Sequence, residues 1–210
     1  MLGLPSTTEV NRALPKKAFY EHLQLDPATR RSFVDDIESI TVRNSVKPAT
    51  TGIPAGEAVQ EVLVLEVALK GETLPVAALT AIARSNPHRL LFACTWEGKA
   101  CLAVLLGSLV VGQWRNAGEV TLKLNPAGMD QTWDAMASQV AYGDEGRAGE
   151  TVEQRHATDE RIARLKEQLA KVDAKRRKEK QFARRNRLFD EANELREQIR
   201  HLEEGRDGTN

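Results

Sequence analysis

The sequence predicts an α+β fold: a mixed α/β body with a five- to six-stranded, largely antiparallel sheet, followed by an antiparallel helical hairpin. Two observations support this class. Several apolar runs of strand length lie before residue 125, whereas helical spacing of apolar residues fills the region after residue 150. A glycine-rich segment separates the two regions. We therefore expect a body at 1–142, a linker at 143–150, a hairpin at 151–205 and a flexible tail at 206–210.

The first long helix of the body is expected to begin at Pro27. Asp26 before it is a good N-cap, and proline is tolerated at the first helical position. Phe33, Ile37 and Ile40 are spaced as one helical stripe, so the helix is expected to continue to about Ile40. Further strands are expected at 41–46, 59–69, 90–95, 100–106, 109–114 and 120–124, with helices at 16–25, 75–84 and 129–140.

The segment Val59–Leu69 is nearly continuous in β-branched and aliphatic residues, which is typical of a central strand covered on both faces. A two-residue turn at Glu97-Gly98 would join the next two apolar runs into a hairpin. This turn places Cys94 opposite Cys101 as a hydrogen-bonded pair, whose wide spacing is poor for a disulfide. We expect both cysteines to be reduced core residues.

The overall charge is balanced, with 30 Lys and Arg against 30 Asp and Glu. A nucleic-acid contact would therefore be local rather than a property of the whole chain. No apolar run approaches 18 residues and no secretion signal is visible, so we expect a cytoplasmic protein without a membrane segment. The four histidines are scattered and none lies near a cysteine at ligand spacing, so neither a metal nor a cofactor is expected.

Two apolar stripes, each with steps of three and four residues, define the helical region. From Val172 to Leu188 the helix would rotate by about 160°, so one straight helix would expose the stripes on opposite sides. Folding the chain back between about 174 and 186 lets the stripes face each other, which favours a hairpin. The expected packing residues are Ile162, Leu165, Leu169, Val172, Leu188, Ala192, Leu195, Ile199 and Leu202.

A strongly basic segment joins the two stripes. Residues 171–187 contain nine Lys or Arg and two acids, a net charge of +7, and in a hairpin this charge lies at the tip. It could be a solvated turn, a contact for nucleic-acid phosphate or an acidic protein surface, or a contact to the body. The candidate binding residues are Lys175, Arg176, Arg177, Lys178, Lys180, Gln181, Phe182, Arg184, Arg185 and Arg187.

The helical region resembles the UVR motif, a helical hairpin that docks proteins in excision-repair subunits. The resemblance lies in Ile162–Val172 and Asn186–Glu204, and it implies a protein-docking role. The connection between the two helices is longer and more basic here. The matching positions are Phe189, Glu191, Ala192, Leu195, Arg196, Ile199 and Leu202.

Four blocks spread over the chain resemble the bacterial domain of unknown function 4391 family. In chain order, the four blocks are LPSTTEVNRALPKKAFYEHL, FVDDIESITVRNSVKP, VQEVLVLEVALK and KEKQF. Members are typically found in restriction and phage-defence loci beside helicase and DNA-methyltransferase genes, which implies an accessory role around foreign DNA. The characteristic positions are Asn11, Pro15, Lys16, Phe19, Tyr20, Lys180, Gln181 and Phe182.

One enzymatic alternative is a metal-dependent restriction-type nuclease with a rearranged or degenerate site. The order helix, strand, strand, strand, helix, strand of such nucleases is approximately present between Pro27 and Leu106. They hold magnesium with acids and place a lysine two residues after the glutamate. Here Glu61 and Glu66 lie on the central strand, and Lys70 follows Glu66 by four residues, about 13 Å along a strand.

The sequence thus predicts an accessory subunit of a DNA-targeting defence or restriction system, with no assigned catalytic residue. The hairpin is expected to dock a larger partner such as a helicase or another defence subunit, to contact a DNA or RNA backbone, or to do both. Whether two hairpins pair into a homodimer is left open.

Overall fold

The computed structural model describes residues 2–207, with only the backbone described at 22, 206 and 207. Contacts divide the chain into two compact units, Met1–Gly146 and Arg147–Asn210. The boundary falls inside the predicted linker at 143–150. Gly143, Gly146 and Gly149 in this segment all have positive φ, a conformation that glycine adopts at little steric cost.

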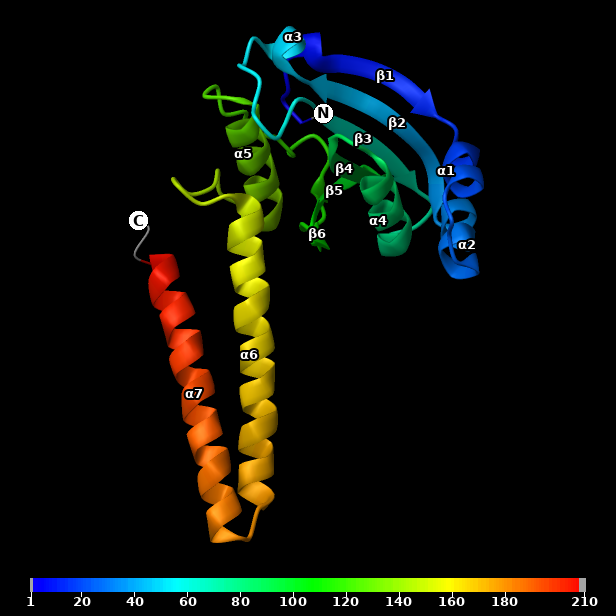
Figure 1. Cartoon of the computed structure of the whole chain (residues 1–210). Helices are drawn as coiled ribbons and strands as arrows, with labels where there is room; N and C mark the ends of the chain where they lie inside the picture. Colours follow the sequence, from blue (N-terminus) through cyan, green and yellow to red (C-terminus); the bar gives the residue numbers. More distant parts are fainter. Residues whose placement is uncertain (1, 208–210) are drawn as a thin grey trace. The chain divides into compact units, whose positions relative to one another are not determined.

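The body is built on one seven-stranded sheet (Figure 1). Its strands are β1 (Glu9–Leu14), β2 (Ile37–Val46), β3 (Val62–Leu69), β4 (Arg89–Trp96), β5 (Lys99–Leu106), β6 (Ser108–Val111) and β7 (Arg115–Asn116). The strands lie in the order β1-β2-β3-β4-β5-β6, and β7 pairs with β5. All neighbours are antiparallel except β3 and β4. The mixed, largely antiparallel sheet predicted from the sequence is confirmed, and β1 adds a strand that the pattern of the N-terminal segment did not predict.

The body also contains helices α1 to α5, and the second unit contains α6 and α7. They are α1 (Lys16–His22), α2 (Pro27–Asp35), α3 (Pro48–Thr51), α4 (Val76–Ser85), α5 (Met129–Ala141), α6 (Val152–Lys178) and α7 (Phe182–Asp207), after a 3-10 turn η1 (Ser6–Thr8). Helix α4 joins β3 to β4, because parallel neighbours need a crossover connection. Within residues 2–207, no helix combines the length and apolar character that a membrane crossing requires.

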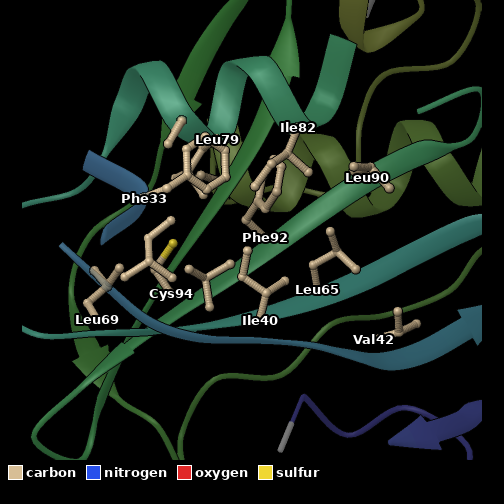
Figure 2. Close-up of a cluster of buried hydrophobic side chains, with 14 residues drawn as sticks. Phe33, Ile40, Val42, Leu65, Leu69, Leu79, Ile82, Leu90, Phe92 and Cys94 are labelled. Carbon is tan, nitrogen blue, oxygen red and sulfur yellow. The ribbon is translucent and has the colours of Figure 1, made fainter. Parts of the chain in front are cut away.

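The core of the body lies between the sheet and helices α2 and α4. Figure 2 shows Leu79 and Ile82 of α4 beside Phe33 of α2 and Phe92 of β4, and all four side chains are at most 1% exposed. Side chains on the other face of the sheet are also buried, such as Val64, which alternates with the core residue Leu65 along β3. Helix α5 contacts β5. On this second face of β3, Val62 and Val64 are buried but Glu66 and Ala68 are half-buried, so the predicted cover on both faces is complete only over the first half of the strand.

The predicted end of the helix that begins at Pro27 was wrong. Asp26 does cap α2, accepting hydrogen bonds from the amides of Ala28 and Thr29, but the helix ends at Asp35. Ile37 and Ile40 lie instead in β2, where the register shifts just after Ile37. This bulge places two residues that are three apart on the same buried face, so a strand shows the spacing of a helix.

The strand predicted at 120–124 was also wrong. Val120 and Leu122 are buried and alternate with exposed neighbours, as the pattern indicated. The segment forms only an isolated bridge, however, between Thr121 and Leu2. Alternation reports which side chains are buried, but a strand also needs a partner that continues the ladder.

The C-terminal unit is an antiparallel helical hairpin, as predicted (Figure 1). Thr151 begins α6 with a capping box to Gln154, an arrangement that satisfies amides otherwise left free at the helix start. Only residues 179–181 separate α6 from α7, within the interval predicted for the turn. Helix α7 extends to Asp207, and the rest of the predicted tail, residues 208–210, lies outside the described residues.

The hairpin of β4 and β5 turns at Glu97-Gly98, where both residues have positive φ. Cys94 and Cys101 are directly opposite each other, and both are free buried thiols, as predicted. Burial raises the pKa of Cys94 to about 12 and that of Cys101 to about 11. The Cys101 thiol also donates to the carbonyl oxygen of Gly112 at 3.1 Å, so neither group is a reactive thiolate near neutral pH.

A polar cluster at the start of β3 connects three strands. Ser45 of β2 donates a hydrogen bond to Glu61, and the amine of Lys47 and the imidazole of His88 lie 3.4 and 3.6 Å from its carboxylate. Partial burial tends to raise the pKa of Glu61, but the hydrogen bond and the nearby cations outweigh this effect and lower it. The folded state therefore favours the ionised carboxylate.

The cysteine environment predicts slow thiol modification. At pH 8, neither Cys94 nor Cys101 of the native protein is expected to react with a disulfide reagent on the minute timescale, because both thiols are buried and protonated. In denaturant both should react at once, which absorbance of the released thiolate would measure. Rapid reaction of either cysteine in the native protein would contradict this environment.

The Glu61 cluster predicts a dependence of stability on pH. A carboxylate whose pKa is lowered by folding stabilises the protein above its usual value of 4.5, and this contribution is lost as pH falls through the folded pKa. Glu61→Gln is therefore expected to cost about 1 kcal/mol of unfolding free energy at pH 7. The difference between wild type and variant should shrink from about pH 5 to about pH 3 in denaturant titrations. A constant difference over that range would contradict the assignment.

Candidate nucleic-acid interface

The hairpin is held by the two apolar stripes predicted from the sequence. All nine predicted packing residues are buried or half-buried between α6 and α7, and Ala192 is fully buried. Two ion pairs fix the register: Lys166 lies 2.8 Å from Glu203, and Asp173 lies 2.8 Å from Arg196. A step of seven residues up α6 thus matches a step of seven residues down α7, as antiparallel packing requires.

The turn at the end of the hairpin is short and hydrogen-bonded. The carboxylate of Glu179 accepts from the amide of Gln181 at 2.8 Å, and the carbonyl of Gln181 accepts from the amide of Arg185 at 2.9 Å. Gln181 therefore occupies the N-cap position of α7. The single acid between Lys175 and Arg187 is used to close the turn.

We call the ten residues predicted as binding candidates, Lys175 to Arg187, the basic tip. The structure brings all of them together around the turn, and all except Arg176 are exposed. Arg176 lies 3.4 Å from Asp173. Within the described part of the chain, the other seven Lys and Arg of the basic tip have no carboxylate within salt-bridge distance; they are Lys175, Arg177, Lys178, Lys180, Arg184, Arg185 and Arg187.

The helix dipoles explain only half of this charge. The four basic residues in the last turn of α6 lie at the negative end of its dipole, where cations are stabilising. Arg184 and Arg185 lie instead in the first turn of α7, at the positive end of its dipole, and this turn contains no acid. Each such cation costs a few tenths of a kcal/mol to the helix. Folding alone therefore does not favour arginines at these positions.

Two phenylalanines lie at the basic tip or beside it: Phe182 is one of its ten residues, whereas Phe189 follows Arg187 by two residues and was predicted only as a position that matches the UVR motif. Phe182, the first residue of α7, is 68% exposed, with the guanidinium of Arg185 5.8 Å from its ring centroid. Phe189 is 46% exposed, and the guanidinium of Arg176 lies 5.6 Å from its ring. The spacing of seven residues, which puts both rings on one side of α7, was the available signal.

The residues proposed for the nuclease alternative lie in three separate environments. Glu66 pairs with Arg43 of β2, whose guanidinium also donates to Asn11 of β1 at 2.9 Å. Lys70 donates instead to the carbonyl of Val34 at the end of α2, at 2.8 Å. Glu61 belongs to the cluster with Ser45 described above and lies about 17 Å from Glu66 along the strand direction.

The element order and the space near Glu66 also differ from those expected for a nuclease. After α2 come two strands rather than three before α4, because β1 precedes α1 and α2. The cavity beside Arg43 and Asn11 has a volume of about 120 Å³, below the usual range for small-molecule sites. Among the side chains that the structure describes, no three His, Cys, Asp or Glu residues gather as metal ligands would.

Comparison with known proteins identifies a family but no characterised relative. No curated protein and no solved structure matches the chain. The sequence profile of the family described as "Domain of unknown function (DUF4391)" matches residues 2–199, which include both the body and nearly all of the hairpin. The chain therefore belongs to the DUF4391 family.

Proposed function

We propose that this protein is an accessory subunit of a DNA-targeting restriction or phage-defence system, and that its basic tip contacts the phosphate backbone of nucleic acid. The observation that carries the proposal is the set of seven exposed Lys and Arg without a carboxylate partner, gathered at one turn. Lys and Arg neutralise phosphates without reading sequence, and they release counterions when they do so. This chemistry suits a subunit that steadies DNA beside a larger partner such as a helicase.

The arrangement on α7 supports a binding role over a solvated turn. A turn needed only for solubility could carry its cations on α6, where the helix dipole favours them. The arginines at the start of α7 oppose the dipole and repel one another, so an external anion would relieve both costs. The defence context rests on the loci in which members of the family are typically found.

Docking of a protein is the competing role for the hairpin, as the resemblance to the UVR motif implies. An acidic protein surface could neutralise the same cations. Apart from Phe182 and Phe189, the hairpin offers little apolar surface for such a partner, because its apolar stripes pack against each other. Nucleic acid is therefore the partner that we propose for the basic tip.

Neutralising the basic tip is expected to abolish most nucleic-acid binding. The variant Arg177→Gln, Lys180→Gln, Arg184→Gln, Arg187→Gln retains both arginines that contact phenylalanine rings. Its affinity for labelled oligonucleotides should fall at least about tenfold, and the slope of log K against log salt should decrease by up to about 3 for single strands. Fluorescence anisotropy across a salt series would measure both quantities.

A matched control carries the same change of net charge outside the basic tip, at four exposed arginines: Arg12, Arg31, Arg84 and Arg161, each replaced by Gln. This control should bind as tightly as the wild type. Equal losses in the two variants, or no binding by the wild type at any salt concentration, would contradict the proposal and leave protein docking as the role of the hairpin.

The nuclease alternative has less support, because Glu66 is paired with Arg43 and lies apart from Lys70. We expect no magnesium-dependent cleavage of supercoiled plasmid that depends on Glu66. Wild type, Glu66→Gln and Glu66→Ala should give equal product on gels, with thermal melting used to verify folding. Cleavage by the wild type that is lost in both folded variants would establish the nuclease and overturn this expectation.

A further inference from the structure

Two partly exposed aromatic rings lie close to the cations of the basic tip: Phe182, which belongs to it, and Phe189, two residues beyond Arg187. Single exposed phenylalanines are common on protein surfaces and need no explanation. Here, however, Phe182 lies among the cations at the turn and Phe189 lies nearly two helical turns farther along α7, and each ring has an arginine guanidinium over it. Neither ring is part of the apolar stripes that hold the hairpin together.

The two rings lie on one side of α7. Positions 182 and 189 are separated by nearly two full helical turns, so the rings are about 10 Å apart along the helix axis. Phe189 directly follows the packing residue Leu188, which places it at the edge of the contact with α6, where Arg176 of α6 reaches its ring. Phe182 lies at the turn itself and has the larger open surface.

We propose that the basic tip prefers single-stranded over duplex nucleic acid, with Phe182 stacking against an unpaired base while the surrounding Lys and Arg hold the flanking phosphates. This inference rests on the proposed function and adds the substrate class. In a duplex the faces of the bases are covered by their neighbours, and only their edges are accessible in the grooves. In a single strand a base can turn outward and stack on an aromatic ring, irrespective of its identity.

The arginines are placed to assist this stacking. Arg185 lies over the Phe182 ring, which leaves the rest of the exposed ring surface for a base. A guanidinium so placed can also contact a neighbouring phosphate, because its donors point outward in the plane of the group. Phe189 and Arg176 repeat the arrangement farther along the hairpin and provide a second position for the same strand.

The test compares ring variants of the full chain on single-stranded DNA, single-stranded RNA and duplex DNA of equal length at about physiological salt. The wild type should bind at least one single strand more tightly than the duplex. Phe182→Ala should weaken single-strand binding by about 5- to 150-fold, the range expected for loss of one base–aromatic stack, and leave duplex binding and the salt slope unchanged. Phe182→Trp should retain the preference, whereas Phe182→Leu, which keeps apolar bulk without a flat π face, should lose it.

The possible outcomes separate this inference from the proposed function. If the wild type binds single strands and duplex equally well, or if Phe182→Ala leaves the affinity for both unchanged, the inference is wrong. The proposed function still stands in that case if the neutralised variant loses binding. If the wild type binds no nucleic acid, both are wrong. Phe182 is exposed at the helix start, so its variants should keep the wild-type melting temperature within about 2 °C.

Discussion

The packing of α6 against α7 determines where the charge of the C-terminal unit lies. It holds eight basic residues around one three-residue turn, although their mutual repulsion opposes this arrangement. Ala192 is fully buried in the interface, which lets the helices approach closely. Asp173 adds an electrostatic link, because its carboxylate contacts Arg176 on its own helix and Arg196 on the other. The apolar interface thus stabilises a concentration of charge that an isolated segment of the same composition would not maintain.

The hairpin could be predicted from the sequence because helical phase is a property of the chain alone. Sixteen residues between Val172 and Leu188 rotate the second stripe away from the first, and a turn is the simplest way to bury both. The end of α2 could not be predicted in this way. A bulge in β2 gives Ile37 and Ile40 the spacing of a helix, and only pairing with β3 distinguishes the two structures.

The basic tip could also be predicted from the sequence, because its cations lie close together along the chain. The contact of Arg176 with Phe189 was not, because it joins two helices and depends on their register. Tertiary contacts also explain why the residues of the nuclease alternative do not assemble. Glu66 is paired with Arg43, which lies 23 residues earlier, and Lys70 donates to a carbonyl at the end of α2. The sequence of β3 alone does not indicate either of these partners.

Nucleic acid is proposed to contact this protein at the turn between α6 and α7. Hydrogen–deuterium exchange of the full chain, alone and with a saturating single-stranded oligonucleotide at low salt, tests this contact most directly. Bound nucleic acid should slow the exchange of the amides in residues 175–190 and leave exchange in the sheet unchanged. Slower exchange confined to the body, with the turn unchanged, would contradict the proposed contact.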